Sequence, residues 1–207
     1  MSARLIYVMG PSGAGKDSVL GWLRERAPAS IPLRWARRTI TRPADAGGEQ
    51  HEAVTPQRFD DLLAADAFAM AWRANGHGYG IRHAELQGLG EGAFVLVNGS
   101  RQYLHEALTR YPRATGLYIT AQPATLADRL RQRKRETASE IQARVARALH
   151  FTPPPGVIVV HNDTTLEEAG AATWQALSRM AGWPAAELST PHSGQGAATG
   201  RREGQGD

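Results

Sequence analysis

The residues best suited to chemistry lie in the glycine-rich segment MGPSGAGKDS, which spans Met9–Ser18. It follows the apolar run Leu5–Met9 and precedes a helical pattern, which is the order of strand, loop and helix that a phosphate-binding loop requires. Glycines let successive backbone N–H groups turn toward an anion, the helix N-terminus adds a partial positive charge, and Lys16 can reach the β- and γ-phosphates. A glycine-rich turn before an ordinary helix is the alternative, but spacing, lysine and flanking elements together favour a nucleoside triphosphate. The predicted contacts are Gly10, Pro11, Ser12, Gly13, Ala14, Gly15 and Lys16.

One position departs from the phosphate-loop pattern G-x-x-x-x-G-K-[ST]. Asp17 stands where a serine or threonine hydroxyl normally binds Mg²⁺. A carboxylate beside triphosphate oxygens is repelled unless a cation lies between them. We therefore expect Asp17 to hold Mg²⁺, directly or through water, or Ser18 to supply the missing hydroxyl. The alternative is that Asp17 only complements the helix dipole in the first turn.

Length and composition limit the class of protein. The 207 residues, 42% of them hydrophobic, fit one α/β domain with a sizeable core. No apolar run approaches the ~20 residues of a membrane span, and no signal peptide precedes the first predicted strand. Zero cysteines exclude disulfides and thiolate metal sites. With no export signal, we expect a cytoplasmic protein.

Positive charge is carried almost wholly by arginine, since Lys16 and Lys134 are the only lysines and the net charge is +4. Arginine suits bidentate phosphate contacts, although a GC-rich genome gives the same bias. The arginines gather near residues 34–42 and 129–147 and do not form a continuous basic face. This distribution disfavours a nucleic-acid partner and predicts two anion-binding regions in one compact site.

Apolar runs alternate with helical patterns along the chain, which favours a largely parallel sheet flanked by helices. The predicted strands are Leu5–Met9, Ala93–Val97, Gly116–Thr120 and Val157–Val160, with Leu33–Ile40 as a further candidate. Phe68–Arg73 and Asn75–Gly80 predict a hairpin in a smaller inserted region. The predicted helices are Asp17–Arg26, Pro56–Ala64 capped by Thr55, Arg101–Arg110, Pro123–Arg133, Ser139–Leu149 after a Thr137–Glu140 capping box, and Leu166–Met180. We expect the domain to cover residues 1–183 and residues 184–207 to form a disordered tail.

The first arginine cluster, Arg37–Arg42, combines guanidinium groups with threonine hydroxyls, which together can clamp a phosphate from several sides. Alone, the cluster could equally be a solvated strand end. Beside a triphosphate site it becomes a candidate for binding the phosphoryl acceptor.

The second arginine cluster, Arg129–Arg135 with Arg144 and Arg147 on the next predicted helix, places many like charges together. Arginines that close over a transferring phosphoryl group stabilise its charge. We therefore expect a mobile, arginine-rich lid, with Arg133 and Arg144 acting as catalytic residues beside Lys16 and Arg129 as a nucleotide contact. For most residues of the cluster, a solvated charged face is the alternative.

The sequence resembles the guanylate kinase branch of the nucleoside monophosphate kinases over roughly residues 4–180. The likeness rests on Gly10–Lys16, Thr39 with Thr41-Arg42, Gly48-Glu49, Tyr79-Gly80, Arg129-Leu130, Arg133, Ser139-Glu140, Arg144 and Asn162-Asp163. It implies a P-loop NTPase fold with ATP as phosphoryl donor and with Arg133 and Arg144 on the transferring phosphates. It also implies that Arg42, helped by Tyr79, holds the acceptor phosphate and that Asn162 lies near the adenine.

The resemblance fails where that branch reads guanine. Carboxylates on two strands accept the N–H donors at N1 and N2 of the base, whereas Ala69, Ala71 and Asn98 stand at those places here. A guanine bound there would bury donors without acceptors, at about 1–3 kcal/mol for each group. Guanine is therefore not the expected acceptor.

These departures resemble an offshoot, the ribose 1,5-bisphosphate phosphokinases of bacterial phosphonate degradation. The shared residues are Gly15–Ser18, Ile40–Ala44, Gly48 with His51, Trp72 with Ala74–Gly76, Tyr79-Gly80, Val97–Arg101 and Ala138–Ile141. The resemblance implies transfer of the γ-phosphoryl group of ATP to the 1-phosphate of the sugar, which gives 5-phospho-α-D-ribose 1-diphosphate (PRPP). The candidates for holding the sugar bisphosphate are Thr41, Arg42, His51, Tyr79, Asn98, Ser100 and Arg101, although His51 could instead be structural.

Two other functions stay open. A nucleoside monophosphate kinase would share the fold, ATP site and lid and would differ only in the acceptor pocket. A non-catalytic guanylate-kinase-like module that binds protein partners would have lost the phosphate loop, which this chain retains. The expected partners are ATP, Mg²⁺ and a sugar bisphosphate, with neither nucleic acid nor a membrane, and a homodimer is left open.

Overall fold

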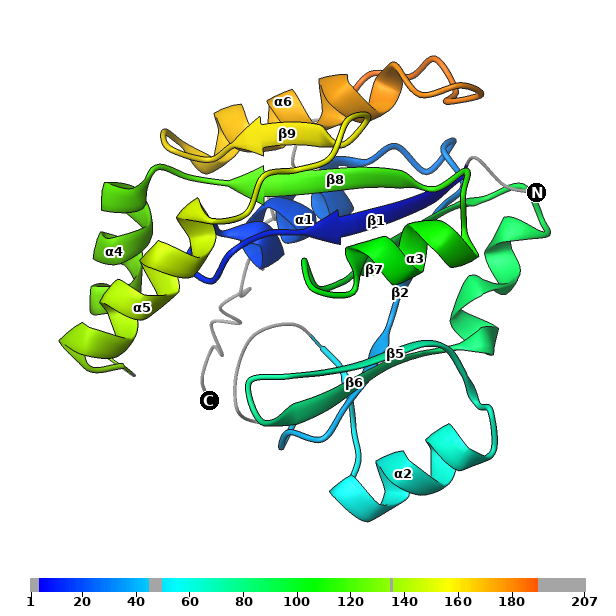
Figure 1. The fold of residues 1–207 in the computed structure, drawn as a ribbon. Coiled ribbons are helices and arrows are strands. Elements are labelled where there is room, and N and C mark those ends of the chain that lie inside the picture. The colour runs from blue at the N-terminus through cyan, green and yellow to red at the C-terminus, as the bar shows by residue number, and fades with distance from the viewer. Residues whose placement is uncertain (1–3, 45–49, 135, 190–207) are drawn as a thin grey trace, which may run out of the picture.

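A parallel sheet of five strands, in the order β2-β7-β1-β8-β9, forms the centre of the molecule (Figure 1). The computed structural model describes residues 4–44, 50–134 and 136–189. The strands are β1 (Leu5–Met9), β2 (Leu33–Ala36), β7 (Phe94–Asn98), β8 (Thr115–Thr120) and β9 (Ile158–His161). All four neighbouring pairs run parallel. The predicted α/β class with a mostly parallel sheet is confirmed.

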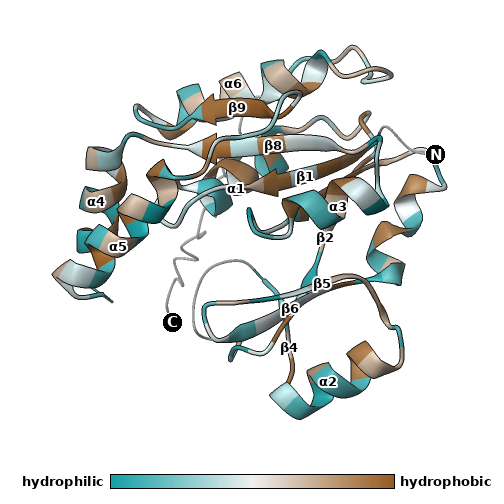
Figure 2. Cartoon of the chain, in the orientation of Figure 1, coloured by the Kyte–Doolittle hydropathy of each residue, from teal (hydrophilic) through white to brown (hydrophobic). Residues whose placement is uncertain are grey.

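Strand β1 shows how this sheet divides the core. Ile6 and Val8 lie in a hydrophobic cluster with residues of α1 (Lys16–Arg26) and α6 (Leu166–Ser178). Leu5, Tyr7 and Met9 point the other way, into a cluster that includes α3 (Leu104–Arg110). Because both faces are covered, β1 is apolar along its whole length, as its brown colour shows in Figure 2.

A second sheet, in the order β4-β3-β6-β5, forms the inserted region. Its strands are β3 (Arg38–Ile40), β4 (Glu52–Ala53), β5 (Phe68–Ala74) and β6 (His77–Arg82). The predicted hairpin is confirmed, because β5 and β6 pair antiparallel around Asn75 and Gly76, whose φ angles are 50° and 77°. The candidate strand over residues 33–40 is correct only in its first half. Residues 33–36 join the main sheet as β2, whereas the chain enters the second sheet at β3.

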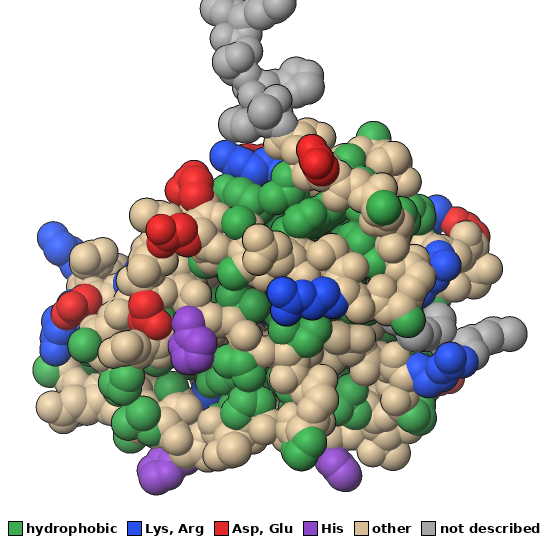
Figure 3. All heavy atoms as spheres, turned by 90° about the horizontal axis from the view of Figure 1, so that it is seen from above, with side chains coloured by type: hydrophobic (Ala, Val, Ile, Leu, Met, Phe, Trp, Pro, Cys, Tyr) green, Lys and Arg blue, Asp and Glu red, His purple; other side chains and the backbone are tan. Residues whose placement is uncertain are grey.

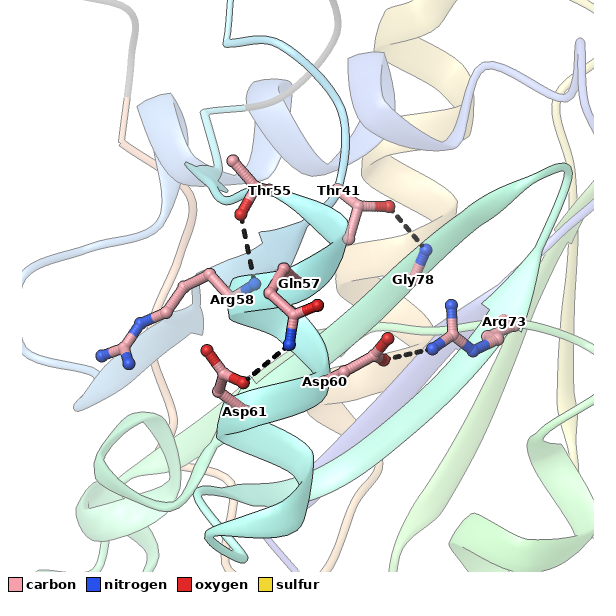
Figure 4. A network of polar contacts seen from close by, with 8 residues as sticks. All are labelled: Thr41, Thr55, Gln57, Arg58, Asp60, Asp61, Arg73 and Gly78. Atoms are coloured by element: carbon pink, nitrogen blue, oxygen red, sulfur yellow. Dashed lines mark hydrogen bonds and ion pairs between the residues drawn. The ribbon is translucent and has the colours of Figure 1, made fainter.

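Helix α2 (Pro56–Ala64) covers one face of the inserted sheet. Thr55 Oγ1 accepts a hydrogen bond from Arg58 N at 3.1 Å, which confirms the predicted cap (Figure 4). An ion pair between Arg73 and Asp60 ties the helix to β5. Beneath it, the ring of Phe59 stacks on Phe68 with a centroid distance of 5.0 Å.

The other face of the inserted sheet joins the core of the main sheet. Ile40, Met70, Trp72, Tyr79 and Ile81 belong to the same buried cluster as Leu5, Tyr7 and Val95. The ring of Trp72 stacks on Tyr79 at 5.6 Å and on Tyr103, beside α3, at 5.5 Å. The inserted region is therefore held against the main sheet by a continuous apolar core.

Helices α4 (Pro123–Gln132) and α5 (Ala138–Leu149) form a hairpin at one end of the main sheet (Figure 1). The predicted capping box at Thr137 and Glu140 is present. Helix α3 begins at Leu104, three residues later than predicted, because residues 101–103 form a turn. A short 3₁₀ helix, η1 (His83–Leu89), was not predicted.

Residues beyond the predicted domain end at 183 also contact the core. Ala186 and Leu188 pack against the α1–α6 cluster, and Ser189 N donates to Arg26 O at 2.9 Å. Residues 190–207 of the predicted tail lie outside the described residues, so that part of the prediction stays a prediction.

In the described part of the chain, no helix could cross a membrane. Figure 3 shows the side on which α6 lies, where basic and acidic side chains are scattered among apolar ones.

Candidate active site

A cleft of about 560 Å³ brings the predicted functional segments together. It is lined by the phosphate loop at the carboxyl end of β1, by strands of the inserted sheet, by the β7–α3 connection and by the α4–α5 hairpin. Ligands of open α/β sheets bind at this carboxyl edge. The predicted site residues that line the cleft are Gly10, Pro11, Ser12, Gly13, Gly15, Lys16, Asp17, Ser18, Arg42, Tyr79, Ser100, Arg101, Arg133 and Arg144.

The phosphate loop depends on its glycines and on Asn162. Gly15 has φ +73°, and a Cβ there would lie 2.4 Å from Asn162 Nδ2. That amide donates to Ala14 O at 2.8 Å, and both residues are buried. Asn162 thus supports the loop from behind and is set back from the cleft. Its predicted position near an adenine stays a prediction.

Arg129 also lies behind the loop. Its Nη1 is 3.6 Å from the position of a Cβ on Gly15. That nitrogen is buried and has no hydrogen-bond partner among the residues that the structure describes. Arg129 is not among the described residues that line the cleft, so its predicted contact with the nucleotide stays a prediction.

Lys16, Asp17 and Asn98 form a closed hydrogen-bonded triangle at the floor of the cleft. Lys16 Nζ donates to Asn98 Oδ1 at 2.5 Å and to Asp17 Oδ1 at 2.9 Å. Asn98 Nδ2 donates to the same Asp17 oxygen at 3.0 Å. Asn98, predicted as a sugar contact, is buried and orients the two residues that face the phosphates.

The environment of Asp17 keeps its carboxyl ionised. Burial opposes ionisation, but the Lys16 ammonium, the Arg38 guanidinium and the Asn98 amide together lower the pKa of Asp17 below its ordinary value. Mg²⁺ in nucleotide sites is commonly held by one or two carboxylates together with phosphate oxygens and water. Among the described residues no group of three or more acids, histidines or cysteines could hold a metal alone. Asp17 and Ser18 therefore fit a Mg²⁺ ion shared with a triphosphate.

Arginines of the α4–α5 hairpin reach the cleft from the other side. Arg144 Nη1 donates to Ser12 Oγ of the phosphate loop at 3.0 Å and lies 3.3 Å from Glu136 Oε1. Arg133, at the end of α4, is exposed and lines the same cleft. Both predicted catalytic arginines thus face the space where the phosphates are expected.

Arg42 follows strand β3 of the inserted sheet and lines the cleft. Contacts at Thr41 and at the Arg42 carbonyl hold the backbone here. Thr41 Oγ1 accepts from Gly78 N at 2.8 Å (Figure 4). His51 Nε2 lies 3.0 Å from Arg42 O. Thr41 and His51 are set back from the cleft, so the structure favours the structural alternative for His51. The motif residues between them, 45–49, lie outside the described residues.

Comparison with known proteins identifies the family. The chain is 49% identical over 166 residues to the ribose 1,5-bisphosphate phosphokinase PhnN of Chromobacterium violaceum, a match that covers 80% of this chain and 89% of that protein. It is 45% identical over 176 residues to the protein of that name from Thiobacillus denitrificans, covering 84% and 93% of the two chains. The chain belongs to the ribose 1,5-bisphosphate phosphokinase family.

Among solved structures, the guanylate kinase from Anaplasma phagocytophilum matches with a TM-score of 0.63 over 85% of each chain at 16% identity. This match shows that the chain has the guanylate kinase fold, as the sequence predicted. No protein-family model matches the chain.

The acceptor wall of this phosphokinase differs in one respect from the prediction. Trp72 and Ala74 of β5 line the cleft. Ala71 packs with the Phe59 and Phe68 cluster on the opposite face, because successive side chains of a strand alternate. The prediction that Ala71 stands in the acceptor wall is therefore wrong. Among the described residues that line the cleft, Asp17 is the only carboxylate, so no acid there faces an acceptor base.

The sequence named Arg38 only as a member of the Arg37–Arg42 cluster, and it gave no sign of the role of Tyr7. Arg38 lines the cleft, and its guanidinium carbon lies 5.3 Å from the centre of the Tyr79 ring. Strand alternation could have found it, since Arg38 shares a face with the buried Ile40. Tyr7 OH donates to Ser100 O at 2.9 Å and accepts from Ser100 N at 2.8 Å. Burial raises the pKa of Tyr7, so its hydroxyl stays protonated and positions the β7–α3 connection.

Proposed function

We propose that the protein transfers the γ-phosphoryl group of ATP to the 1-phosphate of ribose 1,5-bisphosphate, with 5-phospho-α-D-ribose 1-diphosphate and ADP as products. The observation that carries this proposal is the 45–49% identity to two enzymes named for this substrate. The retained phosphate loop and the arginines around the cleft supply the chemistry that such a transfer needs.

The donor half of the reaction is assigned to the phosphate loop. The loop amides and the N-terminus of α1 bind the β- and γ-phosphates, and Lys16 neutralises the oxygens of the migrating group. Asn98 holds the Lys16 ammonium at 2.5 Å, which keeps the charge directed into the cleft. Mg²⁺ held at Asp17 and Ser18 would neutralise further phosphate charge when bound.

The acceptor half needs no general base. An oxygen of the 1-phosphate is already anionic near pH 7, so it attacks the γ-phosphorus directly. A new P–O bond forms to that oxygen while the bond from the γ-phosphorus to the β,γ-bridging oxygen breaks, and ADP leaves with the electron pair. Arg42 and Tyr79 are assigned to the acceptor, and Arg133 and Arg144 to the charge on the equatorial oxygens. Closure of the α4–α5 hairpin would bring Arg133 and Arg144 into contact with those oxygens.

The proposal is tested by acceptor profiling with ATP and Mg²⁺. We expect kcat/KM for ribose 1,5-bisphosphate to exceed that for GMP by at least about a hundredfold, because two unpaired guanine donors cost about 1–3 kcal/mol each. Product detection by mass or NMR identifies the diphosphate. The Lys16→Ala variant is the control for a contaminating kinase. If GMP or another nucleoside monophosphate is the better acceptor, the protein is a nucleoside monophosphate kinase instead.

A further inference from the structure

The cleft holds more arginine than a donor triphosphate and one acceptor phosphate need. Its described lining includes the fixed cations Lys16, Arg38, Arg42, Arg101, Arg133, Arg144 and Arg147 against a single carboxylate. Lys16 and the two arginines of the α4–α5 hairpin assigned above account for the triphosphate. The remaining four arginines form two pairs on different walls.

The first pair, Arg38 and Arg42, comes from the inserted sheet. Arg38 lies over the Tyr79 ring and is near enough to Asp17 to stabilise its charge. This pair therefore adjoins the loop end of the cleft, where the phosphoryl group is transferred. The position of Arg38 and Arg42 is therefore suited to the reacting phosphate of the acceptor.

The second pair, Arg101 and Arg147, comes from the β7–α3 connection and from α5. Arg101 Nη1 donates to Arg147 O at 3.3 Å, and its guanidinium carbon lies 5.5 Å from the centre of the Phe151 ring. The Phe151 ring in turn packs on Tyr118 at 5.0 Å. Arg101 is thus held in place by an aromatic support and a backbone carbonyl.

Arg147, whose backbone carbonyl accepts from Arg101, uses few of its own donors within the described part of the chain. Its Nε donates to Ala143 O at 3.3 Å, while a guanidinium carries five N–H donors. Among the residues that the structure describes, neither Arg101 nor Arg147 forms an ion pair with a carboxylate. Both residues line the same cleft, so an anion bound there can accept hydrogen bonds from each guanidinium group.

We propose that Arg101 and Arg147 bind the 5-phosphate of the sugar bisphosphate. The inference rests on the proposed function and makes it more specific: the pair Arg38 and Arg42 receives the reacting 1-phosphate, and the second pair receives the phosphate at the other end of the sugar. Guanidinium groups suit a phosphate dianion because they can donate two parallel hydrogen bonds. The second pair therefore selects a bisphosphate over a sugar with one phosphate.

The competing assignment is that Arg147 belongs to the ATP site. It lies three residues from Arg144 on the same helix, and Arg144 contacts the phosphate loop. The two assignments differ in the ligand whose binding depends on Arg147, so an experiment can separate them.

The test compares binding of two sugars to the wild type and to variants, by calorimetry in the presence of ADP and Mg²⁺. The sugars are ribose 1,5-bisphosphate and ribose 1-phosphate. We expect Arg147→Ala to weaken binding of the bisphosphate about ten- to hundredfold, the usual effect of losing hydrogen bonds to a charged group, and to weaken ribose 1-phosphate far less. Arg147→Lys keeps the charge without the paired donors, so its affinity for the bisphosphate should lie between those of the wild type and Arg147→Ala. Arg58→Ala, on the exposed face of α2, is the matched control.

Three outcomes would overturn the assignment. The Arg147→Ala variant could retain the full preference for the bisphosphate, it could lose affinity equally for both sugars, or its main defect could be a raised KM for ATP. Because binding is measured without transfer, the test is separate from the proposed reaction. A wild type that binds the bisphosphate through Arg147 but forms no diphosphate would refute the proposed function and leave the 5-phosphate site intact.

Discussion

Asp17 could bind Mg²⁺ or could only complement the dipole of α1, and replacing it by asparagine best distinguishes these two roles. The substitution keeps the shape of the side chain and removes its charge. In the structure, the carboxylate accepts from Lys16 at 2.9 Å and from Asn98 at 3.0 Å, and 49% of its side-chain surface is exposed. Asn98 and Lys16 can still bond to each other in the variant, so the local fold should persist.

The expected loss of stability is small. An ion pair whose carboxylate is half-exposed contributes about 0.2–1 kcal/mol, and an acidic side chain in the first turn of a helix contributes about 0.3–1 kcal/mol. Because the pKa of Asp17 is lowered in the folded state, this contribution is present at neutral pH and is lost as acid protonates the carboxylate. A domain of this size loses about 2–4 °C in Tm for each kcal/mol. Because the two contributions together reach at most about 2 kcal/mol, the upper limit of the decrease in Tm is about 8 °C.

The metal response should change far more. Losing a carboxylate that binds Mg²⁺, directly or through water, should raise the Mg²⁺ concentration for half-maximal turnover at least about tenfold. Asp17→Ser, which restores the usual hydroxyl of the motif, should recover part of the response, and Asp61→Asn on α2 is the control. An unaltered Mg²⁺ titration of Asp17→Asn, with only the small drop in Tm, refutes the metal role. A shift caused by Ser18→Ala alone would assign the ion to the hydroxyl.

Other substitutions test the rest of the site. Lys16→Ala should abolish turnover and leave the circular dichroism spectrum unchanged, since its ammonium faces phosphate and not the core; near-normal activity would contradict the loop assignment. Arg133→Ala and Arg144→Ala should each lower kcat, on the order of 10³-fold, with little change in ATP affinity; a loss confined to KM would indicate uniform binding instead. Gly15→Ala should weaken ATP binding and lower Tm, because its φ of +73° and a contact at 2.4 Å leave no room for a methyl group. Gly21→Ala, in α1 with open space around it, should instead raise Tm by stabilising the helix. Equal effects of the two glycine substitutions would contradict this account.

Features determined by neighbouring residues could be predicted from the sequence. The phosphate loop, the Thr55 cap, the capping box at Thr137 and the turn at Asn75-Gly76 each depend on residues a few positions apart. Their bounds agree with the structure to within a few residues. The arginine clusters were also recognised as parts of one site.

Features determined by distant contacts could not be predicted. The hydrogen bonds between Tyr7 and Ser100 join residues 93 positions apart, and the side chain of Tyr7 lies within an apolar run that otherwise shows only a buried strand. The orientation of Ala71 depended on the register of β5, where an irregularity lies between Phe68 and Met70. Residue types near a site were therefore easier to predict than the face on which each side chain lies.

The aromatic contacts of Trp72 with Tyr79 and Tyr103 have a mechanical consequence. Since these rings belong to the core that both sheets share, the inserted sheet cannot swing away from the main sheet without exposing that core to water. The α4–α5 hairpin is restrained less: near the phosphate loop it packs through a small cluster of Ala14, Ala121, Leu126 and Ala148. Single hydrogen bonds join Arg144 to Ser12 and the carbonyl of Arg147 to Arg101. The inserted sheet is thus expected to stay rigid relative to the main sheet, whereas the arginine-bearing α4–α5 hairpin can move. Motion during turnover should therefore be concentrated in the segment that carries the transition-state charges.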